Sequence, residues 1–174
     1  MKNLMNQRKI KIVKNALLFQ INLGSGIISK MKELGADYIV ESGETQNPSA
    51  QDLINAINSV NADNVFIFVN SSNVILVAQQ AAQVVDDKNV IVIPTKTQIQ
   101  GITAVLNFNS DFEPEENNEI MVDSIEDVQT GMITKAIRNT KIDGIEIKVG
   151  NYLAILNGEI IASTRTASKK PWKH

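Results

Sequence analysis

The chain has 174 residues, of which 43% are hydrophobic and 21% charged. This is enough for one domain that buries roughly 70% of the surface of its unfolded chain. A net charge of −2 gives no electrostatic footprint for nucleic acid or for an anionic membrane surface. The chain has no Cys, and its single His is the last residue, His174, which excludes disulfides, thiolate chemistry, Ser-His-Asp triads and Cys/His zinc sites.

The first 26 residues are basic and then apolar, as in a secretory leader. Gln20 and Asn22 interrupt the apolar run, and no clear small-residue cleavage site follows. An N-terminal extension over residues 1–15 followed by an ordinary strand is therefore the favoured interpretation. No apolar run approaches the roughly 20 residues of a membrane helix. We expect no integral membrane segment and a cytoplasmic location, with which the lack of Cys is compatible.

Four apolar, β-branched runs follow along the chain, and they predict strands buried on both faces, as in a parallel sheet. Three segments between them are long enough for crossover helices. This alternation predicts an α/β fold with a mostly parallel, doubly wound sheet flanked by helices. The predicted strands are residues 16–23, 37–40, 64–69 and 89–94, and the predicted helices are residues 25–34, 49–60 and 74–85.

An acidic segment occupies residues 110–130, with Pro114 near the start of a helix, where Pro is tolerated. Its carboxylates could suggest a cation site. A solvated helix face, with acids near the positive N-terminal end of the helix, explains most of them more simply. We therefore predict no metal site. The carboxylates are Glu113, Glu115, Glu116, Glu119, Asp123, Glu126 and Asp127.

From Gly131 onward apolar residues alternate with a period of two, and the turn dipeptides Asp143-Gly144 and Asn157-Gly158 predict hairpins. An antiparallel β-hairpin segment is thus expected after the parallel sheet. The last residues have no periodicity, carry the only Trp and are basic. We assign residues 16–130 to the parallel core, 131–162 to an antiparallel segment of the same domain, and 163–174 to a disordered tail.

Four loops leave the carboxyl ends of the predicted strands, where ligands bind in open α/β sheets. All four are rich in Gly, Ser, Thr, Asn and Gln. Taken as a set, these loops predict a polar recognition surface. The loops are residues 22–26, 41–49, 70–73 and 94–101. The candidate binding residues are Thr45, Asn47, Asn70, Asn73, Thr95, Lys96 and Thr97, and no catalytic residue is proposed.

Each loop taken alone has a plainer interpretation, which stays open. Asn47 or Ser49 can cap the next helix, Ser49-x-x-Asp52 resembles a capping box, and Asn70 and Asn73 suit turns and caps. The sequence Gly24-Ser25-Gly26 completes neither the dinucleotide nor the P-loop fingerprint. Lys96 is the only cation on this edge and could meet an anion, although a single loop Lys is usually just solvated.

The order and spacing of several motifs resemble the C-terminal region of bacterial dihydroxyacetone kinase-like (Dak-type) proteins, the kinase subunit of fatty acid kinase. The resemblance covers roughly residues 16–162. Two positions depart from it: Glu44 replaces a usual Gly, which weakens the expectation of an anion site, and Ser25 replaces a common acid. The motifs are Gly35-x-Asp37, Gly43-x-Thr45-x-Asn47-Pro48-Ser49, Asn70-x-x-Asn73, Pro94-Thr95-Lys96-Thr97-x-x-Gln100-Gly101 and Asp143-Gly144-x-x-Ile147-x-x-Gly150.

The resemblance implies that ATP and magnesium bind on a separate, helical N-terminal domain, so no cofactor is expected in this chain. It also implies that this region engages a fatty-acid-binding protein subunit, whose fold it shares. The chain is expected to be a fragment or one domain of a larger kinase subunit, not catalytic by itself. The alternative is a stand-alone α/β protein that binds a small ligand, or a hydrolase, at the polar loop edge. Whether the chain forms a homo-oligomer stays open.

Overall fold

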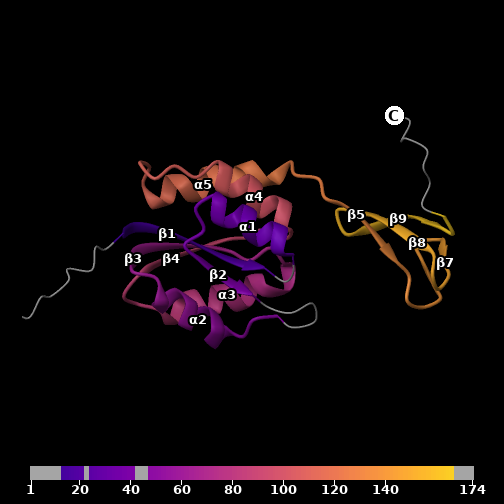
Figure 1. Cartoon of the computed structure of the whole chain (residues 1–174), viewed down its shortest axis with the longest axis horizontal. Coiled ribbons are helices and arrows are strands. Elements are labelled where there is room, and N and C mark those ends of the chain that lie inside the picture. The colour runs from indigo at the N-terminus through magenta and orange to yellow at the C-terminus, as the bar shows by residue number, and fades with distance from the viewer. Residues whose placement is uncertain (1–12, 22–23, 42–46, 167–174) are drawn as a thin grey trace, which may run out of the picture. The chain divides into compact units, whose positions relative to one another are not determined.

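The computed structural model describes residues 13–21, 24–41 and 47–166. These residues form two compact units, Met1–Val128 and Gln129–His174 (Figure 1). The sequence analysis placed residues 131–162 in the same domain as the parallel core. In the structure they lie in the second unit, which has its own small apolar core.

The first unit contains a parallel sheet of four strands in the order β2-β1-β3-β4. Its strands are β1 (Val13–Ile21), β2 (Tyr38–Glu41), β3 (Ala62–Phe68) and β4 (Asn89–Ile93). The α/β fold class with a mostly parallel sheet is confirmed. Strand β1 begins within the segment assigned to the N-terminal extension, because Val13 pairs with Ala62.

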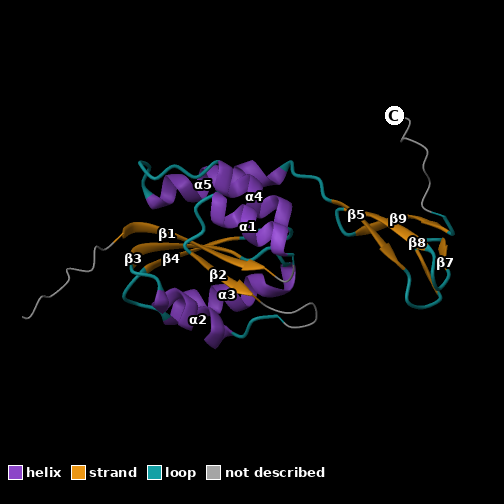
Figure 2. Cartoon of the chain, viewed as in Figure 1, coloured by secondary structure: helices purple, strands orange, loops and turns teal. Residues whose placement is uncertain are grey.

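Helices cover both faces of this sheet (Figure 2). Helices α1 (Ser25–Glu33), α4 (Gln98–Leu106) and α5 (Pro114–Glu126) lie on one face, and α2 (Ala50–Ser59) and α3 (Ser72–Val84) on the other. The helix α4 was missed in the sequence, where residues 94–101 were assigned to a loop. It begins there because the Thr97 side chain caps it by accepting a hydrogen bond from the backbone N–H of Gln100.

Each face of the sheet buries its own apolar cluster, which explains why the strand sequences are apolar throughout instead of alternating. On the face of α1, α4 and α5, the Phe19 and Phe68 rings stack with their centroids 4.4 Å apart. These two residues are register partners on β1 and β3. The stacked pair therefore fixes the alignment of the two central strands.

A chain of amides crosses the same strands near their amino ends. The Asn64 amide donates to Asn15 Oδ1 at 3.0 Å, and the Asn89 amide donates to Asn64 Oδ1 at 3.1 Å. These three residues are register partners on β1, β3 and β4. A slip of one residue would break both bonds, so the amides help to set the register.

The second unit is an antiparallel sheet in the order β5-β8-β9, with a separate two-stranded hairpin. Asp143 and Asn157 have φ near +50° and each precedes a Gly with positive φ, as tight hairpin turns require. The predicted hairpins are confirmed. The three-stranded sheet contains β5 (Gly131–Lys135), β8 (Tyr152–Leu156) and β9 (Glu159–Thr164), and the hairpin contains β6 (Thr140–Ile142) and β7 (Ile145–Ile147).

Strand β9 extends two residues into the segment assigned to the tail, since Ser163 and Thr164 pair with β8. Arg165 and Thr166 follow the strand, and residues 167–174 of the predicted disordered tail lie outside the described residues. Among the residues that the structure does describe, no helix is long and apolar enough to cross a membrane.

Asn117 holds the connection between α4 and α5. Its side chain is fully buried; Oδ1 accepts from the backbone N–H of Asn109, and Nδ2 donates to the Asn109 carbonyl oxygen, both at 2.8 Å. The substitution Asn117→Ala should lower the free energy of unfolding by about 1–3 kcal/mol, because it leaves buried backbone groups unpaired. Chemical denaturation measures this. The adjacent Asn118→Ala is the control and should stay within about 0.5 kcal/mol of the parent chain.

Candidate functional site

The carboxyl edge of the parallel sheet contains a topological switch point between β1 and β3. The chain leaves β1 into α1 on one face and leaves β3 into α3 on the other. In open α/β sheets, ligand sites form outside the carboxyl ends of the strands at such a switch point. The site is therefore built from the ends of β1, β3 and β4.

Asn70 links the ends of these three strands. Its backbone N–H donates to Thr95 Oγ1 after β4 at 3.0 Å, and its side-chain amide donates to the Gln20 carbonyl oxygen on β1 at 3.1 Å. Asn70 has φ of 53°, a left-handed conformation that Asn tolerates better than most residues. Together these bonds form a brace across the switch point, which we call the Asn70 brace.

Gly101 lies directly against the brace. A Cβ at this position would stand 2.2 Å from Asn70 Oδ1, so only Gly allows α4 to approach this closely. Asn70 Oδ1 is buried and has no hydrogen-bond partner among the described residues. Asn70 Oδ1 lies against α4 at Gly101, so the brace reaches from the sheet edge to the start of that helix.

The segment after β4 is held by its own hydrogen bonds. Thr95 is fully buried, whereas the Lys96 side chain is exposed. The backbone N–H of Lys96 donates to Gln100 Oε1 at 2.7 Å, and Gln100 Nε2 donates to the Ile125 carbonyl oxygen at 3.3 Å. Lys96 is therefore an exposed cation on a backbone tied to both α4 and α5.

The loop that enters α2 is only partly described, and Thr45 lies outside the described residues. Asn47 is exposed, and Ser49 is the N-cap of α2. The Ser49 hydroxyl accepts from the backbone N–H of Asp52, and the Asp52 carboxylate accepts from the backbone N–H of Ser49. The predicted capping box is confirmed. Hydrogen bonds from the Ser49 hydroxyl and, to a smaller extent, from the Ser49 backbone N–H lower the pKa of Asp52.

Of the seven predicted binding residues, Asn70 and Thr95 are joined by a hydrogen bond. Lys96 and Thr97 follow Thr95 in the chain, and Thr97 is the N-cap of α4. Asn73 is exposed in the first turn of α3, whose N-cap is Ser71. Thr95 does not present its side chain to solvent, since the hydroxyl is an internal acceptor.

The sequence analysis did not propose two residues that complete this edge. Gln20 is a buried polar residue that directly follows the apolar residues 16–19 of β1, and that interruption was its signal. Gly101 lies inside a helix, where Gly is unfavourable unless another group approaches its backbone. Within the described ranges no group of three or more His, Cys, Asp or Glu side chains could hold a metal ion.

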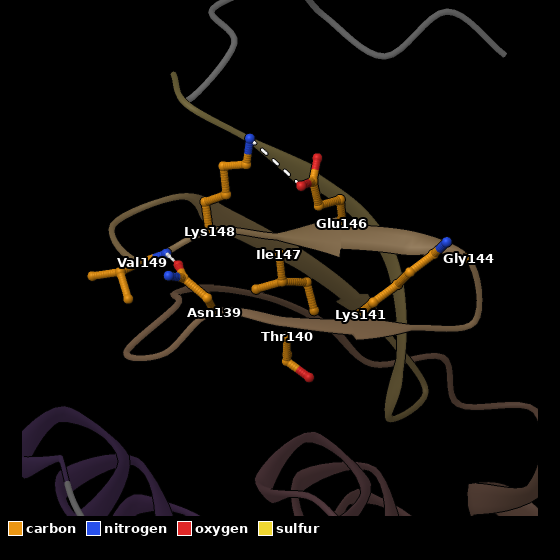
Figure 3. A pocket seen from close by; sticks show the side chains of 8 residues that line it. All are labelled: Asn139, Thr140, Lys141, Gly144, Glu146, Ile147, Lys148 and Val149. Carbon is orange, nitrogen blue, oxygen red and sulfur yellow. Dashed lines mark hydrogen bonds and ion pairs between the residues drawn. The ribbon is translucent and has the colours of Figure 1, made fainter.

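A surface hollow lies elsewhere, on the hairpin of the second unit (Figure 3). Several of its polar groups bond to one another within the hairpin and its flanking turns. Lys148 pairs with Glu146 at 3.5 Å, and Asn139 Oδ1 accepts from the backbone N–H of Val149 at 2.8 Å. It is open, and one short hairpin with its flanking turns lines it. The braced sheet edge is the better candidate, because several elements converge there.

Comparison with known proteins assigns the chain to one protein family. The C-terminal family of FakA-like fatty acid kinase proteins matches residues 18–170. Protein YloV of Bacillus subtilis (strain 168) is 47% identical over 144 residues, which are 83% of this chain and 26% of that protein. An uncharacterized protein of Staphylococcus aureus (strain USA300) is 37% identical over 155 residues, 89% of this chain and 28% of that protein. The chain thus spans about a quarter of the length of these curated relatives.

The contact between Gly101 and Asn70 generates a double-mutant prediction. Gly101→Ala should lower the free energy of unfolding by about 1–3 kcal/mol, because the new methyl group overlaps a held side chain. In the Asn70→Gly background the same change should cost less than about 0.5 kcal/mol, since the overlapping atoms are gone. Denaturation of the four chains measures the coupling.

Gly26→Ala is the matched control for this cycle. Gly26 is also helical, but a Cβ there meets nothing within 4 Å. Its substitution should be neutral or stabilising, because Ala is the better helix former. An equal cost for Gly101→Ala in both backgrounds would contradict the contact.

The capping box generates a pH prediction. The pKa of Asp52 is lower in the folded chain than in the unfolded chain. The Asp52 carboxylate therefore stabilises the fold at pH values above its unfolded pKa, and this stabilisation is lost as the pH falls through its folded pKa. The stability difference between the parent chain and Asp52→Asn should therefore shrink on acidification from about pH 5 to about pH 2. Ser49→Ala, which removes a hydrogen-bond donor to that carboxylate, should reduce the pH dependence in the same way. Parallel stability curves for all three chains would contradict the capping box.

Proposed function

Because the chain belongs to the C-terminal family of FakA-like fatty acid kinase proteins, we propose that it is a non-catalytic recognition module of a fatty acid kinase system. In this proposal it docks the protein subunit that carries the fatty acid. The carboxyl edge of the parallel sheet is the docking surface. The proposed system acts in the cytoplasm.

The observation that carries this proposal is the Asn70 brace beneath an exposed polar edge. Partly buried hydrogen bonds fix the ends of β1, β3 and β4, so the exposed side chains beside them are held on a rigid support. Lys96 and Asn73 are exposed at this edge. A preorganised polar surface loses little side-chain and loop freedom when a partner binds, which favours recognition of a folded protein.

The same geometry disfavours the hydrolase alternative. A hydrolase needs a nucleophile that a substrate can reach and a base beside it. Thr95 is fully buried, and its hydroxyl already accepts the Asn70 N–H. The polar edge therefore suits binding better than bond cleavage. A stand-alone role in binding a small anion at Lys96 is the remaining alternative.

We place the ATP and magnesium of the proposed system on another domain. Phosphoryl transfer needs metal ions held by carboxylates beside the phosphates, and a loop that cradles those phosphates. The exposed acids of α5 sit on a solvent face instead, and none of the loops on the polar edge completes a phosphate fingerprint.

Titration of the full chain with a purified fatty-acid-carrying subunit, followed by calorimetry, tests the proposal. Lys96→Ala and Asn73→Ala should each weaken binding about tenfold, which corresponds to about 1.4 kcal/mol. Both side chains are exposed, so the melting temperature should stay nearly unchanged.

Lys32→Ala supplies the control, because Lys32 is an exposed Lys in the last turn of α1, at the far end of that helix from the polar edge. Its affinity should equal that of the parent chain. Full affinity in both edge variants would remove the edge from the interface. Tighter binding of a small anion than of the protein subunit would favour the stand-alone alternative.

A further inference from the structure

Two neighbouring loops form one end of the second unit. Residues 136–139 follow β5, and residues 148–151 precede β8. Backbone hydrogen bonds at Ala136 join the two loops, and Asn139 Oδ1 accepts from the backbone N–H of Val149 at 2.8 Å. Figure 3 shows Asn139 and Val149 beside each other. We call these two loops the loop end of the second unit.

Two aliphatic side chains project from the loop end. Ile137 is 91% exposed, the highest fraction for a large apolar residue in the described part of the chain, and Val149 is 59% exposed. Ala136, one residue before Ile137, is buried and hydrogen-bonded through both its N–H and its carbonyl oxygen. The backbone beside Ile137 is therefore fixed, and the side chain is held out in water at an energetic cost that binding would remove.

Cations surround these aliphatic groups. The strand register places Lys135 of β5 and Thr164 of β9 on either side of Tyr152, so Arg165, which follows Thr164, belongs to the same end. Arg138 lies in the loop itself. The Lys135 ammonium lies 5.2 Å from the centre of the Tyr152 ring. No carboxylate among the described residues forms an ion pair with any of these three cations, and all three are exposed.

The acids in the described part of the second unit are placed differently. Asp143 lies in the turn at the opposite end of the β6–β7 hairpin, and Glu159 begins β9 at the opposite end of the three-stranded sheet. Glu146 is paired with Lys148. Positive charge is therefore concentrated at the loop end, although the net charge of the whole chain is −2 and gives no sign of it.

We propose that the loop end of the second unit binds the surface of an anionic phospholipid bilayer. The side chains of Ile137 and Val149 enter the boundary between headgroups and acyl chains, where their apolar surface leaves water. The cations remain at the level of the lipid phosphates, which attract them. These cations are Lys135, Arg138 and Arg165.

An acidic protein surface would also attract these cations, but the shape of the loop end favours a bilayer. An aliphatic side chain that projects from a loop needs a matching pocket on a protein partner, whereas a fluid interface accepts it at any position. The proposed contact does not use the carboxyl edge of the parallel sheet. It therefore stands or fails independently of the proposed docking of the fatty-acid-carrying subunit.

Cosedimentation of the full chain with lipid vesicles tests the proposal. The chain should bind vesicles made of equal parts of phosphatidylcholine and phosphatidylglycerol, at about 0.1 M salt, where charge attraction extends over about 10 Å. Affinity for vesicles of phosphatidylcholine alone should be at least about tenfold lower, because their surface carries no net negative charge. Failure to bind the anionic vesicles, or equal binding to both kinds, would overturn the proposal.

Substitutions at the loop end locate the contact. Ile137→Ser and Arg138→Glu should each lower the affinity for anionic vesicles at least about fivefold, since one loses inserted apolar surface and the other reverses a charge near the phosphates. Both side chains are exposed, so the melting temperature should stay nearly unchanged. Leu106→Ser in α4 and Lys32→Glu in α1 are the matched controls, because they make comparable changes at exposed positions of the first unit. Both controls should bind like the parent chain, and parent-like binding by both loop-end variants would contradict the proposal.

A fluorescent probe distinguishes insertion from a purely electrostatic contact. Because the chain has no Cys, Ile137→Cys creates a single site for an environment-sensitive fluorophore. Its emission should shift to shorter wavelength when anionic vesicles are added, as the probe leaves water, whereas the same label on Leu106→Cys should not respond. An unchanged emission at the loop end, or an equal shift with soluble polyglutamate, would indicate recognition of an acidic surface in place of a bilayer and would overturn the proposal.

Discussion

The hydrogen bonds of Asn70 are the interaction on which the carboxyl edge of the sheet depends. One side chain and one backbone N–H join the ends of three strands, and the close contact with Gly101 adds the start of α4. A parallel sheet exposes strand ends that its own ladder does not pair. Asn70 supplies such bonds at the switch point, in a left-handed conformation that few residue types adopt. The amide chain of Asn15, Asn64 and Asn89 plays a similar role at the opposite end.

Because of this bracing, some polar residues of the loops hold the sheet edge in shape, and others are exposed at it. Buried Thr95 and half-buried Asn70 maintain the shape of the edge, and Lys96 and Asn73 are the exposed residues that the proposed function assigns to contact with a partner. The helix caps are also structural, since the Ser49 and Thr97 side chains accept hydrogen bonds from backbone N–H groups in the first turns of α2 and α4. Residues that hold the edge and residues exposed at it thus lie next to each other in the chain and differ in burial, as Thr95 and Lys96 do.

Periodicity was enough to predict the parallel sheet, its flanking helices and the later hairpins, because strands buried on both faces require continuous apolar runs. It missed α4, whose first turn looks like a polar loop until the Thr97 cap is seen. The division into two compact units was also not predicted, because a turn-rich β segment has the same sequence pattern whether or not it forms an apolar core of its own. The candidate residues could be placed on one edge from topology. Their burial could not, because Thr95 and Lys96 are both polar and adjacent, and only the hydrogen bond to Asn70 distinguishes them.

The central claim is that a preformed, braced edge receives the fatty-acid-carrying subunit. Native-state amide hydrogen exchange, with and without that subunit, tests it most directly. The account predicts that the Asn70 N–H is already protected in the free chain, since Thr95 accepts it, and that binding adds protection to residues 70–73 and 96–101. Rapid exchange of the Asn70 amide in the free chain, or new protection confined to other segments, would contradict the account.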